Sequence, residues 1–268
     1  MPDDRRRGPA VTLAAHAKLT LSLRVIGVRA DGLHLIDAEM TSIDLHDRVT
    51  IEPGGSGMTV TGPYADGVPT DDRNLAVRAL GDRQAALTID KRIPHGGGLG
   101  GGSADAAAVL RWADHPTDAA GLRAAASLGA DIAFCLIGGR ARVRGIGEIV
   151  EPLPHVDRTV TLVIPPLRAP TSAVYRAWDD LGGPTADGAN DLEPAALRAV
   201  PTLARWRDRI GELTGHTPIL AGSGATWFVH GEHVGALAAL GNEGADVMAA
   251  QTVPARQRES KGGSSSRS

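Results

Sequence analysis

Hydrophobic and polar residues alternate with a period of two near the start of the chain. Residues 17–27 carry apolar side chains at every second position: Leu19, Leu21, Leu23 and Val25. This alternation predicts a strand with one buried face, and it places Lys18 at the start of the polar face. The Asp31-Gly32 pair predicts a turn at 29–34, and residues 46–62 predict two short strands joined by a glycine-rich hairpin.

Patterns typical of helices appear further along the chain. Residues 71–84 predict a short helix, and residues 85–94 predict a strand. A longer helix is expected to begin at Ser103 as N-cap, with Asp105 in its first turn, because a row of alanines follows. A further helix is expected within 118–131.

The second half of the chain continues to mix the two patterns. It predicts, in order, strands at 140–145 and 159–166, a helix at 171–183 with Thr171 as N-cap, two helices within 190–213 that break at Pro201, a strand, glycine turn and strand over 218–231, and a helix near 232–241. No repeating βαβ rhythm appears, which favours an α+β fold over a doubly wound parallel sheet. The two prolines of residues 151–157 indicate a linker, and residues 255–268 are rich in glycine and serine and are expected to be disordered.

Composition narrows the class of protein. The 268 residues are 42% hydrophobic and 3% aromatic, so a core of small aliphatic residues is expected. The net charge of -3 gives no general attraction to nucleic acid or to an anionic membrane. A lone cysteine, Cys135, excludes a disulfide framework and a cysteine-based zinc site. No apolar run reaches about 18 residues and no signal peptide is recognisable, so a cytoplasmic protein is expected.

Residues 94–107, PHGGGLGGGSADAA, place six glycines around Leu99 directly before the predicted helix. One interpretation is a flexible connection with no ligand. The other is a phosphate site, because glycine backbone can turn its N–H groups into one concavity that the N-terminus of the helix completes.

Two known phosphate loops do not fit this stretch. Gly96, Gly98 and Gly101 match G-x-G-x-x-G, but the acidic residue that should end a second strand about 20 residues later is missing. A G-x-x-x-x-G-K-[ST] loop fails because Ser103 follows Gly102 with no lysine between them. The sequence therefore indicates a phosphate loop of a third kind.

The glycine stretch resembles the phosphate-binding motif of the GHMP kinases, and its GGLGGGS form is similar to the branch that acts on a cytidine-diphosphate-linked methylerythritol in isoprenoid precursor synthesis. Other segments match the family's motifs in the same order: 16–34, 74–80, 90–94, 128–134, 145–153, 190–194 and 221–229. The resemblance implies an ATP-dependent kinase that phosphorylates the 2-hydroxyl of this substrate. It also implies a two-domain α+β fold, with an ATP-binding domain at 1–156 and a second domain with a mainly antiparallel sheet at 157–254.

The resemblance assigns Asp131 as the base that takes the alcohol proton and Lys18 as its electrostatic partner. Without it, Asp131 would be an ordinary turn residue after Gly129, and Lys18 an ordinary lysine on an exposed strand. Asn74 is implied to contact the purine of ATP. The implied ATP loop is Pro94, His95, Gly96, Gly97, Gly98, Leu99, Gly100, Gly101, Gly102, Ser103 and Ala104.

Ser103 has two open roles by this resemblance, capping the helix or offering its hydroxyl to phosphate or Mg²⁺. The residues implied for the substrate, with a cytidine ring against the aromatic one, are His34, Lys91, Thr171 and Tyr175. The chain departs from the family at Leu33, where tyrosine is usual, at Arg73 in place of aspartate, and also at Thr20 and Ala133. These departures concern the substrate more than the phosphate chemistry.

Three alternatives stay open on the sequence. The first is another GHMP kinase that acts on a different alcohol, which Leu33 favours. The second is a nucleotide-binding homologue without catalysis, and the third, more distant, is a dinucleotide-dependent oxidoreductase. The expected partner is a small-molecule substrate, with no nucleic acid and no membrane. A monomer or homodimer is expected.

Overall fold

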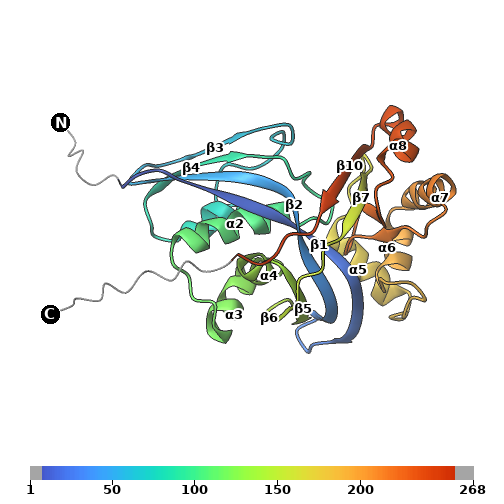
Figure 1. Cartoon of the computed structure of the whole chain (residues 1–268). Coiled ribbons are helices and arrows are strands. Elements are labelled where there is room, and N and C mark those ends of the chain that lie inside the picture. Colours follow the sequence, from blue (N-terminus) through green and yellow to red (C-terminus); the bar gives the residue numbers. More distant parts are fainter. Residues whose placement is uncertain (1–7, 257–268) are drawn as a thin grey trace.

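The computed structural model describes residues 8–256, which form two sheets with helices packed against each (Figure 1). The elements are β1 (Val11–Val28), β2 (His34–Pro53), β3 (Met58–Thr61), α1 (Leu75–Leu80), β4 (Ala85–Asp90), α2 (Gly101–Trp112), α3 (Ala119–Leu128), α4 (Ile132–Ile137), β5 (Arg140–Gly145), β6 (Ile149–Leu153), β7 (Thr159–Ile164), α5 (Thr171–Asp180), α6 (Glu193–Ala199), α7 (Leu203–Thr214), β8 (Ile219–Leu220), β9 (Trp227–His230), α8 (Val234–Leu237), a 3-10 helix (Ala238–Glu243) and β10 (Asp246–Gln251). The expected disordered tail lies outside the described residues from position 257 onward.

The long strand β2 organises the first sheet. It pairs with β1 along its whole length, and its other edge pairs with β5 in its first half and with β4 in its second half, all antiparallel. The strand predicted at 17–27 is confirmed and extends in both directions. Its alternation fills the core with aliphatic side chains, since Leu19, Leu21 and Leu23 are all buried.

The predicted hairpin within residues 46–62 is wrong. Strand β3 does not pair with β2 but lies parallel to β4, which stands between them. The burial of the strands explains this arrangement. Leu87 and Ile89 of β4 are buried, as suits an inner strand, whereas Thr59 and Thr61 of β3 are exposed, as suits an edge.

Helix α2 packs against β1 and β2 and against its neighbours α1 and α4. Its alanines, Ala106 to Ala108, are fully buried, and their small side chains let the helix lie close to the sheet. The predicted start of this helix is wrong, because Gly100 is the N-cap in the left-handed conformation and Ser103 lies inside the helix. The glycine loop therefore runs directly into the helix without a side-chain cap.

The second sheet is antiparallel with the order β10-β7-β9-β8, and α5 to α8 lie beside it (Figure 1). The two helices broken at Pro201 and the glycine turn before Trp227 are confirmed, whereas β10 was not predicted. Thr171 is the first residue of α5 and not its cap, since Pro170 is the N-cap and no side chain caps this helix. The chain passes from the first sheet to the second between Leu153 and Thr159.

The two sheets are joined by polar contacts as well as by the chain. The backbone of Leu23 in β1 exchanges hydrogen bonds with Ala189 (2.8 Å) and Asp191 (2.9 Å). Between those two residues, the buried Asn190 side chain donates to the carbonyls of Leu220 (2.9 Å) and Gly222 (2.6 Å). One asparagine thus links the first sheet to the glycine turn of the second.

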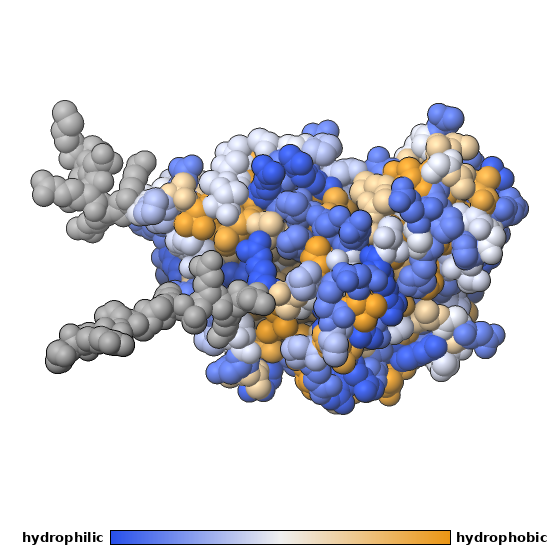
Figure 2. Space-filling model, viewed as in Figure 1, coloured by the Kyte–Doolittle hydropathy of each residue, from blue (hydrophilic) through white to orange (hydrophobic). Residues whose placement is uncertain are grey.

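The surface is ordinary for a protein of this composition. Hydrophilic residues cover most of the visible face, and hydrophobic ones appear in small separate groups (Figure 2). Among the described residues, no helix is both long enough and apolar enough to cross a membrane.

We expect Asn190→Ala to lower the free energy of unfolding by about 2 to 4 kcal/mol, because it leaves two buried carbonyls and the Leu192 N–H without partners. Urea denaturation measures this loss. The exposed Asn242→Ala is the control and should stay within about 0.5 kcal/mol of wild type. An equal, small effect of both substitutions would contradict the proposed link.

Candidate active site

The glycine loop is held by backbone on both sides. Gly96, Gly98 and Gly100 have φ of +79°, +79° and +68°, a region that favours glycine. A Cβ on Gly98 would lie 2.4 Å from the carbonyl oxygen of Ala221, and one on Gly97 would lie 2.9 Å from the Thr226 hydroxyl. The loop is therefore packed against the 221–226 turn of the second sheet.

Lys18 and Asp131 meet at the end of this loop. Their Nζ and Oδ2 atoms are 3.6 Å apart, with the lysine side chain 6% exposed and the aspartate 32% exposed. The Lys18 amide donates to the Leu99 carbonyl (3.0 Å), and Nζ donates to the Thr20 hydroxyl (3.1 Å). A Cβ on Gly100 would lie 2.7 Å from Lys18 Cγ and 3.7 Å from Asp131 Oδ2. The loop thus runs directly past an accessible carboxylate and a nearly buried cation.

The Asp131 carboxylate does not bind the amides of its own helix. Asp131 stands at the N-cap of α4, where an aspartate side chain commonly binds the helix amides. Here it makes no capping hydrogen bond, and its αR backbone differs from the extended conformation usual for a cap. The turn interpretation of the sequence is correct for the backbone, yet the side chain points to Lys18.

A cavity of about 320 Å³ lies on the other side of the loop, and it joins several residues predicted for ATP. Asn74, His95, Gly96 and Gly102 all line it. The Asn74 side chain is engaged in the fold, since Oδ1 accepts from the Ala76 amide (2.9 Å) and Nδ2 donates to the Pro69 carbonyl (2.8 Å). Asn74 therefore shapes the cavity wall by capping α1 and holding the Pro69 loop.

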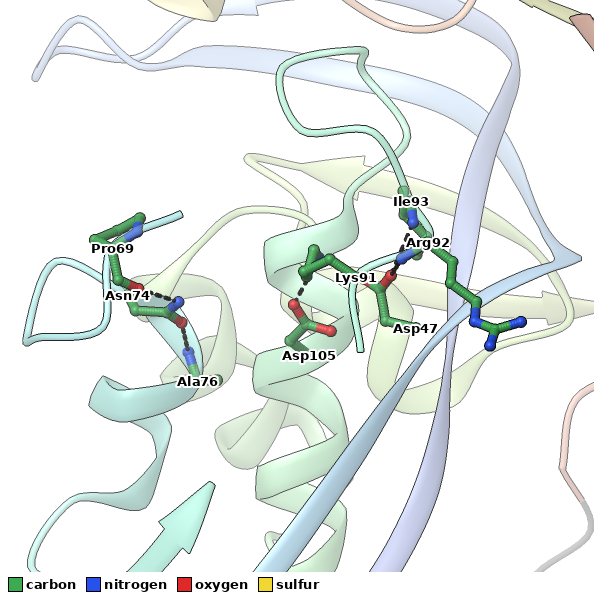
Figure 3. Close-up of polar contacts among 8 residues, drawn as sticks. All are labelled: Asp47, Pro69, Asn74, Ala76, Lys91, Arg92, Ile93 and Asp105. Carbon is green, nitrogen blue, oxygen red and sulfur yellow. Dashed lines mark hydrogen bonds and ion pairs between the residues drawn. The ribbon is translucent and has the colours of Figure 1, made fainter. Parts of the chain in front are cut away.

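Lys91 lies in this same cavity, which corrects its expected place near His34. It is buried between two carboxylates, with an ion pair to Asp47 and another to Asp105 at 2.8 Å (Figure 3). Asp47 Oδ1 also accepts from the amides of Arg92 (2.5 Å) and Ile93 (2.8 Å). This buried triad, Asp47, Lys91 and Asp105, fixes the start of the glycine loop to β2 and α2.

The triad holds two carboxylates for one cation. Burial raises the pKa of the Asp105 carboxyl to about 7, with the Lys91 charge opposing this and the Asp47 charge adding to it. Asp105 Oδ1 is buried and has no hydrogen-bond partner in the described part of the chain. Asp105 was expected in the first turn of a helix, and nothing in the local sequence indicates that it pairs with Lys91.

The rings of His34 and Tyr175, both predicted for the substrate, contact each other. Their ring centroids are 4.5 Å apart at 32°, and His34 Nε2 donates to Asp179 Oδ1 (2.7 Å). Trp178 contacts the same histidine edge-on at 5.5 Å. Burial raises the pKa of the Tyr175 phenol, and the negative charge of Asp131 adds to this shift.

Thr171 is the first residue of α5, the helix that carries Tyr175. Its hydroxyl is 3.0 Å from that of Ser223, in the turn that packs against the glycine loop. The site residues predicted from the sequence included neither this turn nor Arg168, whose guanidinium lies 3.2 Å from His95 Nε2 and which also lines the cavity. A second glycine-rich segment, AGSGAT, was the available signal for the turn.

Comparisons with known proteins agree with this geometry. Residues 73–139 match the model of the GHMP kinases N terminal domain. A 4-diphosphocytidyl-2-C-methyl-D-erythritol kinase of Paracoccus denitrificans is 38% identical over 236 residues, covering 80% of this chain and 85% of the relative. The chain belongs to the 4-diphosphocytidyl-2-C-methyl-D-erythritol kinase family of the GHMP kinases.

Solved structures agree with this assignment. The crystal structure of a 4-(cytidine 5'-diphospho)-2C-methyl-D-erythritol kinase superposes with a TM-score of 0.71 at 32% identity, over 90% of this chain and 99% of that one. A homoserine kinase from Cytophaga hutchinsonii gives 0.58 at 15% identity, over 96% and 98%, which shows the fold alone. The α+β kinase fold expected from the sequence is confirmed, as is an ATP-dependent small-molecule kinase.

The site fits a nucleoside triphosphate. The glycine loop leaves no room for side chains at Gly97 and Gly98, and Lys18 and Arg168 place positive charge at its two ends. Residues 8–256 contain no group of three or more metal-binding His, Cys, Asp or Glu side chains. Mg²⁺ commonly binds phosphate oxygens and water together with only one or two protein ligands. A kinase site for Mg²⁺ and ATP therefore does not require a cluster of three such side chains.

We expect Gly98→Ala to lower the free energy of unfolding by at least about 2 kcal/mol, because its Cβ would meet the Ala221 carbonyl and its φ is unfavourable for alanine. Urea denaturation measures the change. Gly102→Ala in the same motif is the matched control: its nearest neighbour would be Leu75 Cδ1 at 3.9 Å, and alanine favours the helix by up to about 1 kcal/mol. Equal stability of the two variants would show that the loop is not held by the second sheet.

The triad predicts a dependence of stability on pH. The pKa of Asp105 is about 7 in the folded protein and about 3.9 in an unfolded chain, so only the folded state holds this proton between those values. The contribution of Asp105 to stability therefore falls as pH rises through this window. We expect Asp105→Asn, which carries no charge, to gain roughly 1 kcal/mol or more over wild type between pH 4.5 and 7.5.

Denaturation at several pH values measures this difference. The exposed Asp208→Asn on α7 controls for the general change in net charge. A constant difference between Asp105→Asn and wild type, or one that shrinks as pH rises, would contradict the shifted Asp105 carboxyl.

Proposed function

We propose that this kinase transfers the γ-phosphoryl group of ATP to the 2-hydroxyl of 4-diphosphocytidyl-2-C-methyl-D-erythritol. The observation that carries the proposal is the Lys18–Asp131 pair, 3.6 Å apart at the end of the glycine loop, in a chain whose relatives bear that substrate's name. The cytoplasmic location and the monomer or homodimer state stay predictions of the sequence.

The residues proposed to hold ATP are those of the loop and the adjoining cavity. The backbone N–H groups within residues 95–103 would contact the phosphates, and the wall shaped by Asn74 would face the base. ATP supplies the phosphoryl group when it is bound. The hydroxyl of Ser103, which has no hydrogen-bond partner among the described residues, is proposed to serve phosphate or Mg²⁺, since the observed helix start leaves it no capping role.

Asp131 is proposed to accept the proton of the attacking alcohol. A carboxylate can do so only if it is accessible and has a free lone pair. Asp131 is 32% exposed and makes no capping hydrogen bond, and its ion pair with Lys18 at 3.6 Å involves only Oδ2. Lys18, held by its own amide on Leu99 and by its Nζ on Thr20, keeps a positive charge beside the reacting oxygen. A fixed cation of this kind offsets negative charge that develops during phosphoryl transfer.

The aromatic group around His34 is proposed to bind the cytidine end. The rings of His34 and Tyr175 already contact each other, so the base would stack on an outer face of this pair and not between the rings. Leu33, which is 44% exposed beside His34, offers an aliphatic contact where relatives of this branch usually carry tyrosine. Lys91 is not proposed to contact the cytidine, because its side chain is buried in the triad with Asp47 and Asp105.

The identity of the alcohol is tested by ADP release with a panel of substrates. We expect turnover with 4-diphosphocytidyl-2-C-methyl-D-erythritol and at least about 100-fold lower kcat/KM with homoserine, mevalonate and free 2-C-methyl-D-erythritol 4-phosphate, since these lack the cytidine contacts. Comparable turnover of another alcohol would favour the alternative that the exposed Leu33 suggests, a GHMP kinase of different specificity.

The role of Asp131 is tested by Asp131→Asn. We expect kcat to fall by at least about 100-fold, because the amide cannot accept the proton, while the affinity for ATP stays within a factor of about three. The exposed Asp208→Asn on α7 should retain the wild-type rate. An unchanged rate for Asp131→Asn would refute its role as the base, and lost ATP affinity would point to a damaged fold instead.

A further inference from the structure

A cavity of about 930 Å³ is not part of the site described above. It lies where α2 and α4 end, whereas the glycine loop and Asp131 lie where these helices begin. Its walls come from the last turns of the two helices, from β1, from the loop before α3 and from residues 253–256. None of the residues predicted for ATP or for the alcohol lines it.

Arg111 brings a buried positive charge to this cavity. Its guanidinium donates to the carbonyls of Cys135 (2.7 Å) and Ala14 (3.4 Å), and its Nε atom is buried without a partner. It forms no ion pair with a carboxylate within residues 8–256. Burial lowers the pKa of this arginine to about 10, and the charge of Arg256 adds to that shift. A guanidinium has five N–H donors, so donors remain for a further group.

Arg256 converges on the same point. Its guanidinium donates to the carbonyl of Ala14 at 3.2 Å, the oxygen that Arg111 also contacts. Two guanidinium groups therefore lie side by side with only backbone carbonyls as described partners. Two guanidinium groups that share one carbonyl oxygen repel each other, and an anion bound beside them would offset this repulsion.

Two carboxylates, Asp114 and Asp118, also line the cavity. The Asp118 side chain accepts from the Gly121 amide (2.8 Å) as the N-cap of α3, so one of its oxygens serves that helix. The remaining wall is largely apolar, with Pro116, Leu136, Ile137 and Val253 among its residues. The cavity thus combines two guanidinium groups with a largely apolar wall.

We propose that this cavity binds a small organic anion, with a phosphate group held by Arg111 and Arg256 and a hydrocarbon body against the apolar wall. Arginine forks match phosphate oxygens in geometry, and apolar surface adds affinity in proportion to the area it buries. Occupation of the cavity would reach the kinase site through two elements. His16 of its wall is two residues before Lys18 in β1, and Cys135 donates its amide to the Asp131 carbonyl (3.0 Å).

The test is calorimetric titration of the full chain with hexyl phosphate, with hexanol and inorganic phosphate as comparison probes. We expect one site for hexyl phosphate, weaker binding of inorganic phosphate and none of hexanol at the same concentration. Saturating the kinase site with a non-hydrolysable ATP analogue should leave hexyl phosphate bound. Arg111→Gln and Arg256→Gln should each weaken it by about 10-fold.

Arg209→Gln, an exposed arginine on α7, is the matched control and should bind hexyl phosphate as wild type does. Because Arg111 also holds the end of α4, Arg256→Gln decides the matter if Arg111→Gln fails to fold. Displacement of hexyl phosphate by the ATP analogue, absence of binding at millimolar concentration, or equal binding by wild type and Arg256→Gln would overturn the proposal.

Discussion

The close backbone contact between the glycine loop and the 221–226 turn is the constraint on which the site depends. The Ala221 carbonyl stands where a side chain of Gly98 would be, and the Thr226 amide donates to the Gly97 carbonyl (3.1 Å). The loop is flexible as a sequence but fixed as a structure, because a different sheet supplies its rigidity. The observed position of the loop therefore requires both halves of the chain to be folded and docked.

The buried triad performs a similar task on the other side of the loop. Asp47 in β2 accepts hydrogen bonds from the amides of Arg92 and Ile93, which lead into the loop. Lys91 forms ion pairs with both Asp47 and Asp105 and so links β2 to α2. A buried ion pair of this kind adds little net stability compared with apolar packing, but breaking it leaves an uncompensated charge. Its contribution is to fix the position of the segment that leads into the loop.

The sequence predicted the parts of the site that are local in the chain. The glycine stretch, the strand that carries Lys18 and the turn that carries Asp131 each have a recognisable pattern within about ten residues. The pairing of Lys91 with Asp47 was not predictable, because it joins positions 44 residues apart and neither has a distinctive neighbourhood. The hairpin predicted within residues 46–62 was wrong for a related reason. Strand β4 lies between β2 and β3, and which strand takes an inner position depends on burial in the whole sheet and not on the local sequence.

Asn74 illustrates why a motif residue and a contact residue differ. Its place in the family pattern suggested a hydrogen bond to the purine, yet both ends of its amide are occupied by the Ala76 and Pro69 backbone. An amide that caps a helix and holds a loop acts through the shape of the cavity it builds. Its place in the motif is therefore explained by the geometry of the cavity wall, which Val68 and Leu75 also line.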